Sequence, residues 1–174
     1  MKTQNNLKEK FSQGTIIIHW LTALLILSLF PMGKYMYGLE LLEKTTLLKI
    51  HAIFGIIVLI LTIIRSVFFF TKKRPADLKT GSKLNDKIAI WIHNIFYFLL
   101  FGIGFSGLAV MVTGGYVDFL KTGDASLVLN KEDIGPMAAH GLMSFIMMVL
   151  LLLHVLGVVK HYFFTKENTL KRIF

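Results

Sequence analysis

The sequence contains no cysteine, which excludes disulfides, iron–sulfur clusters and cofactors attached covalently through thiols. It is also poor in charge, since 17% of its residues are charged, against about 25% in a typical soluble domain. Hydrophobic residues make up 55% of the chain. A soluble protein of 174 residues could not bury so much apolar surface. The composition therefore indicates a membrane protein in contact with lipid.

The net charge of +9 raises the question of a nucleic-acid partner. A basic protein that is also strongly apolar more often carries its lysines on the cytoplasmic face of a membrane. We therefore expect no nucleic acid among the partners of this chain.

Four apolar runs are each long enough to cross a bilayer, which takes about 20 residues. The first run is too long for a signal peptide, lacks a small-x-small cleavage site and contains His19, so we expect it to stay as a helix, with Thr15 as its cap. The sequence predicts an all-α, integral membrane four-helix up-down-up-down bundle, a single domain over residues 1–174. The predicted spans are about 16–37, 47–70, 88–112 and 137–162.

The orientation follows from the distribution of lysine and arginine, because cytoplasmic segments carry the excess. The two terminal segments and the link between the second and third runs hold 14 basic residues, counting Arg65 with the link. The opposite side holds five: Lys34, Lys44, Lys49, Lys121 and Lys131. Both termini are therefore predicted to be cytoplasmic.

The runs contain histidines, and an ionisable side chain in a membrane span needs a reason to exist. Four of them sort into two pairs by depth. His140 and His154 are fourteen residues apart, so they share a helix face and differ in depth by about 21 Å. With the predicted orientation, His51 matches His140 near the outer surface, and His19 matches His154 near the inner surface.

Two histidines at equal depth on facing helices suit the axial positions of a low-spin haem, so the pattern predicts two haem iron sites. The alternative is a set of histidines that bond to neighbours or line a proton path. A zinc site is a weaker alternative, because zinc favours four ligands at one point and these histidines lie at two depths. Gly55, Gly141 and Gly157 lie close to the histidines and would let a macrocycle or a neighbouring helix approach, although glycine also serves ordinary helix packing.

Three further residues near the inner surface could donate or exchange a proton. Arg65 is fourteen residues after His51 and lies on the same helix face. Its functional partner would be a haem propionate or a quinone carbonyl, and the alternative is that its side chain extends to the membrane surface. His93 is the rival of His19 as inner ligand, and His161 is seven residues past His154. We predict a quinone site formed by Arg65, His93 and His161, with a solvated positive rim as the alternative.

The segment Gly102–Gly107 reads GIGFSG and matches a dinucleotide-binding fingerprint. It lies in the middle of a predicted span, with no strand before it and no acid at the required distance. We therefore expect these glycines to serve helix packing.

Several segments together resemble the bacterial cytochrome b-561 family of four-helix, two-haem b membrane proteins. They are IIIHWLTALLIL around His19, LLKIHAIFGIIVLILTIIR from His51 to Arg65, the pair His140 and His154, and the ending HYFFTKENTLKRIF. The resemblance implies that His19, His51, His140 and His154 ligate two haem b groups in a multi-pass protein of the bacterial inner membrane. It also implies an oxidoreductase of the respiratory chain that exchanges electrons with ubiquinone.

The resemblance leaves the electron donor open. One branch of the family oxidises superoxide, an anion that a positive outer mouth would attract. The outer segments here carry six acids against five lysines, which argues against superoxide unless Lys49 and its neighbours focus charge locally. The alternatives are a cytochrome b anchor subunit of a dehydrogenase or hydrogenase and, more weakly, a metal transporter. A protein partner or a homodimer is left open.

Overall fold

The computed structural model describes residues 9–77, 83–165 and 169–174, and every element within them is helical. Four long helices form the body: α1 (Gln13–Tyr37), α2 (Thr45–Thr71), α3 (Lys83–Thr113) and α5 (Gly135–Lys160). All four are long and apolar enough to cross a membrane. The predicted all-α architecture and its four spans are confirmed. The domain prediction, residues 1–174, begins in the segment 1–8, which lies outside the described residues.

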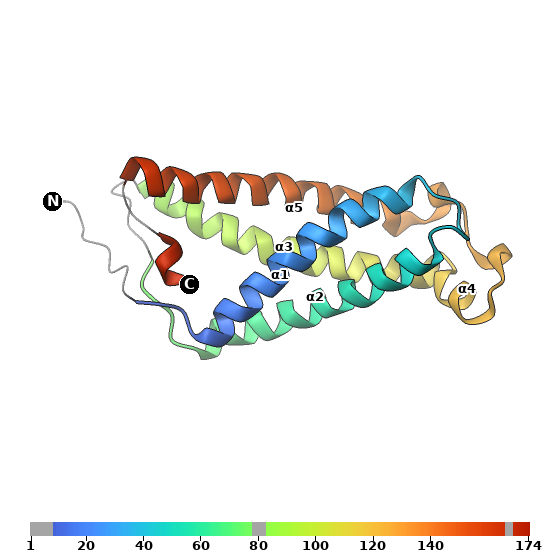
Figure 1. The fold of residues 1–174 in the computed structure, drawn as a ribbon, viewed down its shortest axis with the longest axis horizontal. Coiled ribbons are helices and arrows are strands. Elements are labelled where there is room, and N and C mark those ends of the chain that lie inside the picture. The colour runs from blue at the N-terminus through green and yellow to red at the C-terminus, as the bar shows by residue number, and fades with distance from the viewer. Residues whose placement is uncertain (1–8, 78–82, 166–168) are drawn as a thin grey trace.

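The four helices run along an elongated bundle (Figure 1). The start of α1, the end of α2 and the C-terminal residues 169–174 lie at one end, which we call the terminal end. The α1–α2 connection and the short helix α4 (Tyr116–Thr122) lie at the other, the loop end. Four of the 14 basic residues counted at the terminal end, Lys2, Lys8, Lys79 and Lys166, lie outside the described residues.

The structure differs from the expectation in local features, and α3 begins at Lys83, five residues before the predicted start at about residue 88. The cap of α1 is Ser12 and not Thr15, because the Ser12 hydroxyl accepts a hydrogen bond from the Thr15 amide at 3.3 Å. The connection before α5 contains α4, which starts and ends at glycines with positive φ, Gly115 at 76° and Gly123 at 79°. Beyond α5 the chain continues as a π-helical segment, His161–Thr165.

The bundle is held by two apolar clusters at different depths. Helix α3 packs closely on α5 and α2, and α2 packs on α1. The middle cluster joins all four long helices through Leu29, Val58, Leu99, Leu100 and Met147. The loop-end cluster is built from Val110, Tyr116 and Ile134, which α3, α4 and the start of α5 contribute.

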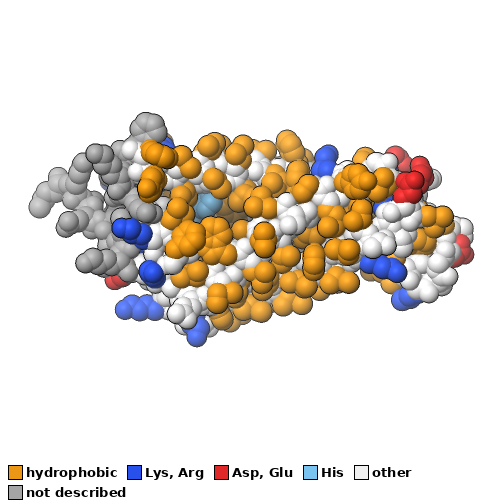
Figure 2. Space-filling model, in the orientation of Figure 1, with side chains coloured by type: hydrophobic (Ala, Val, Ile, Leu, Met, Phe, Trp, Pro, Cys, Tyr) orange, Lys and Arg blue, Asp and Glu red, His pale blue; other side chains and the backbone are white. Residues whose placement is uncertain are grey.

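The glycines of the GIGFSG segment lie against neighbouring helices, as expected for packing. A Cβ atom at Gly102 would lie 2.5 Å from the Met143 sulfur, and one at Gly104 would lie 2.8 Å from Leu59 Cδ1. Such distances leave no room for a side chain without a shift. Large apolar side chains cover the outward faces of the long helices, and the charged residues gather toward the ends (Figure 2). The helices therefore present a lipid-compatible belt.

The C-terminal residues return to the terminal end and join three distant segments, an arrangement that we call the terminal clamp. Arg172, only 6% exposed, donates to the carbonyls of Ala76 at 2.6 Å and Glu9 at 3.4 Å. Its own carbonyl accepts from the Phe11 amide at 3.1 Å. Next to it, the Trp20 indole donates to the Ile173 carbonyl at 2.9 Å and packs on the Phe174 ring. Trp20 in turn packs edge-on against His19, so the clamp lies beside a candidate site residue.

Candidate functional site

The structure brings the predicted histidines together at two levels, one on each side of the middle apolar cluster. His51 on α2 and His140 on α5 form the loop-end pair. His19 on α1, His93 on α3 and His154 on α5 gather at the terminal end with Arg65. The fourteen residues from His140 to His154 separate the levels by about 21 Å along α5.

The loop-end pair faces across the bundle with the imidazole centroids 6.2 Å apart and the ring planes at 70°. Two metal–nitrogen bonds of about 2 Å, together with the distance from each nitrogen to its own ring centre, amount to roughly 6 Å. The observed separation therefore equals the spacing of two imidazoles that share one metal ion between them.

Each imidazole of the loop-end pair keeps at least one ring nitrogen available for a ligand. His140 Nδ1 lies 3.0 Å from the Ile103 carbonyl and 3.2 Å from the Ser106 hydroxyl. Because a carbonyl only accepts, Nδ1 carries the proton, and Nε2 keeps its lone pair, as in histidines that ligate metals. His51 Nδ1 is buried and has no hydrogen-bond partner among the described residues. An orphaned buried nitrogen is costly unless a further group binds there.

Glycines on neighbouring helices hold both loop-end imidazoles by their edges. A Cβ atom at Gly33 on α1 would lie 3.2 Å from His51 Cε1, and one at Gly107 on α3 would lie 3.1 Å from His140 Cε1. At Gly55, Gly141 and Gly157, the positions singled out from the sequence, a Cβ atom would meet nothing within 4 Å. The glycines that fit against the histidines are thus ones that face them across a helix interface, and sequence spacing along one helix could not identify them.

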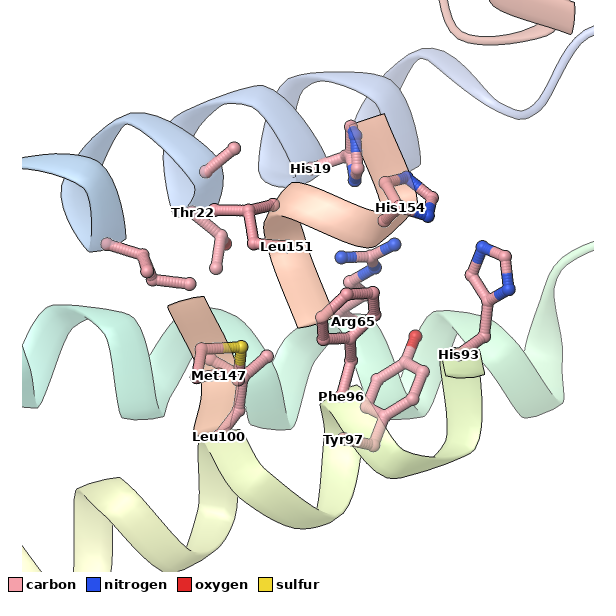
Figure 3. Close-up of a pocket in the computed structure, with 12 residues that line it drawn as sticks. His19, Thr22, Arg65, His93, Phe96, Tyr97, Leu100, Met147, Leu151 and His154 are labelled. Carbon is pink, nitrogen blue, oxygen red and sulfur yellow. The ribbon is translucent and has the colours of Figure 1, made fainter. Parts of the chain in front are cut away.

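The terminal-end level is a mostly apolar pocket between the helices, and Figure 3 shows the polar side chains of His19, Arg65, His93 and His154 gathered at it. The His93 and His154 rings meet edge to face at 5.4 Å, and Phe96 packs on His154 at 5.6 Å. The residues that line the terminal-end pocket are His19, Thr22, Ala23, Ile26, Arg65, His93, Phe96, Tyr97, Leu100, Met147, Leu151 and His154.

Two residues of this pocket were not anticipated from the sequence. Thr22 is 3% exposed, and its hydroxyl has no hydrogen-bond partner among the described residues. The Arg65 guanidinium lies 5.5 Å from the centre of the Tyr97 ring. Helical spacing could have identified both residues, because Thr22 is three residues after His19 and Tyr97 is four after His93, which puts each on the same helix face as a histidine.

His93 is oriented as metal-ligating histidines often are, since its Nδ1 lies 2.6 Å from the Ala89 carbonyl and Nε2 keeps its lone pair. His161 lies in the π-helical segment after α5, and the described residues that line the pocket do not include it. Its predicted membership of a quinone site therefore gains no support from the pocket.

The donor set at both levels fits haem iron. Each level offers imidazoles from different helices, and each contains a buried polar atom without a partner, His51 Nδ1 at one and Thr22 Oγ1 at the other. In the described part of the chain, no group of three or more histidine, cysteine or acidic side chains has an arrangement that could hold a metal ion by itself. The zinc alternative, which needs such an arrangement, gains no support.

Comparisons with known proteins agree with a haem-binding site. The model of the family described as prokaryotic cytochrome b561 matches residues 10–174. The chain is also similar to "Cytochrome b561 homolog 2" of Escherichia coli (strain K12), with 26% identity over 178 residues that cover 97% of this chain and 93% of that protein.

Proposed function

Because the chain belongs to the prokaryotic cytochrome b561 family, and is thus a multi-pass haem b electron-transfer protein of the bacterial inner membrane, we propose that it holds two haem b groups. They connect an electron donor at the outer face to the ubiquinone pool. The observation that carries the proposal is the 6.2 Å separation of the His51 and His140 rings. This separation would let the two imidazoles, which come from different helices, bind one haem iron between them.

In this proposal, His51 and His140 would hold the haem iron at the loop end, and His19 and His154 would hold it at the terminal end. Bound there, haem b supplies reversible one-electron transfer. The protein keeps each imidazole in position: the Ile103 carbonyl fixes the His140 ring, and Gly33 and Gly107 let helices α1 and α3 approach the rings closely. The middle apolar cluster keeps water and ions out of the space between the two levels.

The proposed place where ubiquinone is reduced lies beside the terminal-end haem, on the side of Arg65 and His93. Arg65 offers guanidinium N–H donors to a quinone oxygen, and His93 can exchange a proton. Tyr97 packs under the Arg65 guanidinium and orients it. Since both termini are proposed to be cytoplasmic, protons for the quinol enter from that side.

The orientation has its own test, because it depends on the basic-residue count alone. Reporter fusions that follow residue 174 should be active only in their cytoplasmic form. A periplasmic signal from such a fusion would reverse the assignment of inner and outer levels and with it the direction of electron entry.

The donor side leaves two candidates, a small molecule such as superoxide or a protein. The test is purification of the chain in detergent, followed by a pyridine haemochrome assay and stopped-flow spectroscopy. We expect a b-type α-band, about two haems per chain, fast haem reduction by superoxide or another small donor, and reoxidation by ubiquinone.

Other outcomes separate the competing functions. A chain that is reduced only when a larger dehydrogenase or hydrogenase co-purifies with it is an anchor subunit. A chain without a b-type spectrum is no cytochrome, and the metal transporter that uses the same histidines becomes the better explanation.

A further inference from the structure

Two of the five lysines at the loop end are withdrawn from solvent. Lys44, at the start of α2, is 8% exposed, and Lys131 is half-buried. The other three, Lys34, Lys49 and Lys121, are exposed. A long charged side chain normally keeps its head group in water, so the burial of the first two needs an explanation.

The contacts of these two ammonium groups do not provide it. Lys44 Nζ donates one long hydrogen bond, at 3.4 Å, to the Leu39 carbonyl. Lys131 Nζ donates to the Tyr37 carbonyl at 2.5 Å and lies 4.6 Å from the centre of the Tyr37 ring. Within the described residues, neither has a carboxylate within ion-pair distance, and the loop-end pair that forms is Lys121–Asp118.

The electrostatics of the lysine pair favour an anion. Burial lowers the pKa of Lys44, and the neighbouring Lys131 lowers it further, while Glu40 raises it. The two ammonium groups bond to carbonyls only two residues apart, those of Leu39 and Tyr37. Their like charges therefore lie close enough to repel, and an anion between them would relieve the repulsion. The amino end of the long helix α2 adds positive potential at the same point.

The pair lies on the side of the loop-end histidines. Lys44 continues the helical hydrogen bonding of α2, because its amide bonds to the Glu40 carbonyl and its own carbonyl accepts from the Leu48 amide. It precedes His51 by seven residues, which puts both on one face of α2, about 10 Å apart along the axis. Lys131 reaches the same region from the other connection, in the short helix Lys131–Asp133 just before α5.

We propose that Lys44 and Lys131 form a carboxylate-binding site for the propionates of the haem that His51 and His140 would hold. The inference rests on the proposed function, since it takes a haem at the loop end as given. The ammonium groups would hold the carboxylates by charge-assisted hydrogen bonds and would raise the reduction potential of that haem, because nearby positive charge favours the electron-rich state.

The test compares lysine variants in the purified holoprotein. Lys44→Met keeps the apolar stem, Lys44→Arg keeps the charge, and Lys131→Gln removes the second cation. The matched controls, Lys34→Gln and Lys121→Gln, remove exposed cations at the same end. The measurements are the potential of each haem by spectroscopic redox titration and the rate of haem loss to excess apomyoglobin.

We expect Lys44→Met and Lys131→Gln to lower the potential of the loop-end haem and to speed its loss about tenfold, which is the worth of a charge-assisted hydrogen bond. The terminal-end haem should be unchanged, the two controls should behave as wild type, and Lys44→Arg should restore retention. If Lys44→Met shifts the loop-end haem no more than Lys34→Gln does, the propionate site is wrong.

Two other results would also overturn the inference. A loop-end potential that depends on added phosphate in wild type, and loses this dependence in Lys44→Met, would assign the site to a soluble anion. If His51→Ala contains as many haems as the wild type, there is no loop-end haem on His51 and the proposed function itself is wrong. Haem stoichiometry of these two proteins shows this before any lysine variant is measured.

Discussion

The loop-end pair and the terminal-end pocket contain the same kind of side chain in different surroundings. At the loop end, two imidazoles stand 6.2 Å apart, and each has an edge against a glycine. The buried cluster of Val110, Tyr116 and Ile134 lies at the same end of the bundle. At the terminal end, three histidines share an open pocket with an arginine and a tyrosine. The difference indicates that the loop end is built to hold a bound group rigidly. The terminal end, in addition, can exchange protons and a ligand.

The largest expected effect is the loss of one haem at a time. His140→Ala should remove the loop-end haem and His154→Ala the terminal-end haem, so that haem content falls from about two to about one per chain in each case. Pyridine haemochrome on the purified variants measures this. His161→Ala, at a histidine outside the pocket, is the control and should keep both haems. Loss of both haems from either single variant would show that the two levels are not independent.

The next effect separates the two histidines that compete for the terminal-end level. His19→Ala should abolish the terminal-end haem, whereas His93→Ala should keep it and change its spectrum slightly, because His93 packs edge-on against His154. Low-temperature absorption spectra with haem quantification decide between them. The reverse result would make His93 the ligand and place the second haem between α3 and α5.

A smaller effect concerns the exchange function of the terminal end. Arg65→Ala should leave haem content near normal and slow electron transfer from reduced haem to ubiquinone about tenfold, since a hydrogen bond to a charged group is worth about 1.5–3 kcal/mol. The readout is stopped-flow reoxidation. Arg74→Ala, which removes a cation stacked on Phe69 at the same end, is the control. Unchanged rates in Arg65→Ala, His93→Ala and His161→Ala alike would place the quinone site beside the loop-end pair.

The smallest effect tests how rigidly the loop end holds its histidines. Gly107→Ala puts a methyl group 3.1 Å from His140 Cε1, and such overpacking costs about 1–3 kcal/mol. Gly55→Ala, where a Cβ atom meets nothing within 4 Å, should change stability by less than about 0.5 kcal/mol. Thermal release of the loop-end haem compares them. Equal behaviour of the two variants would mean that the glycine contact does not position His140.

The sequence predicts the spans well because apolar runs long enough to cross a bilayer have few other uses. Histidine depth also follows from helix rise, so His51 and His140 could be paired in advance. Helix α4 could not be predicted, since its ends are set by two glycines with positive φ within an otherwise polar connection.

Contacts between helices were equally out of reach of the sequence. Helical periodicity tells which residues share a face but not which face a neighbouring helix presents to it. Gly33 and Gly107 therefore could not be assigned to the histidines they touch. Gly55 was considered only because it lies on the same helix as His51. The burial of Lys44 depends on how the two connections of the loop end fold together, which no local pattern records.

The terminal clamp also sets an order of assembly. Arg172 bonds to carbonyls 96 and 163 residues earlier in the chain, at Ala76 and Glu9. Contacts over such separations form after the intervening helices are in place, because closing long loops costs entropy before any contact rewards it. During biosynthesis the terminal end is thus the last part of the bundle to close. A closed clamp marks a chain whose four helices have all been inserted.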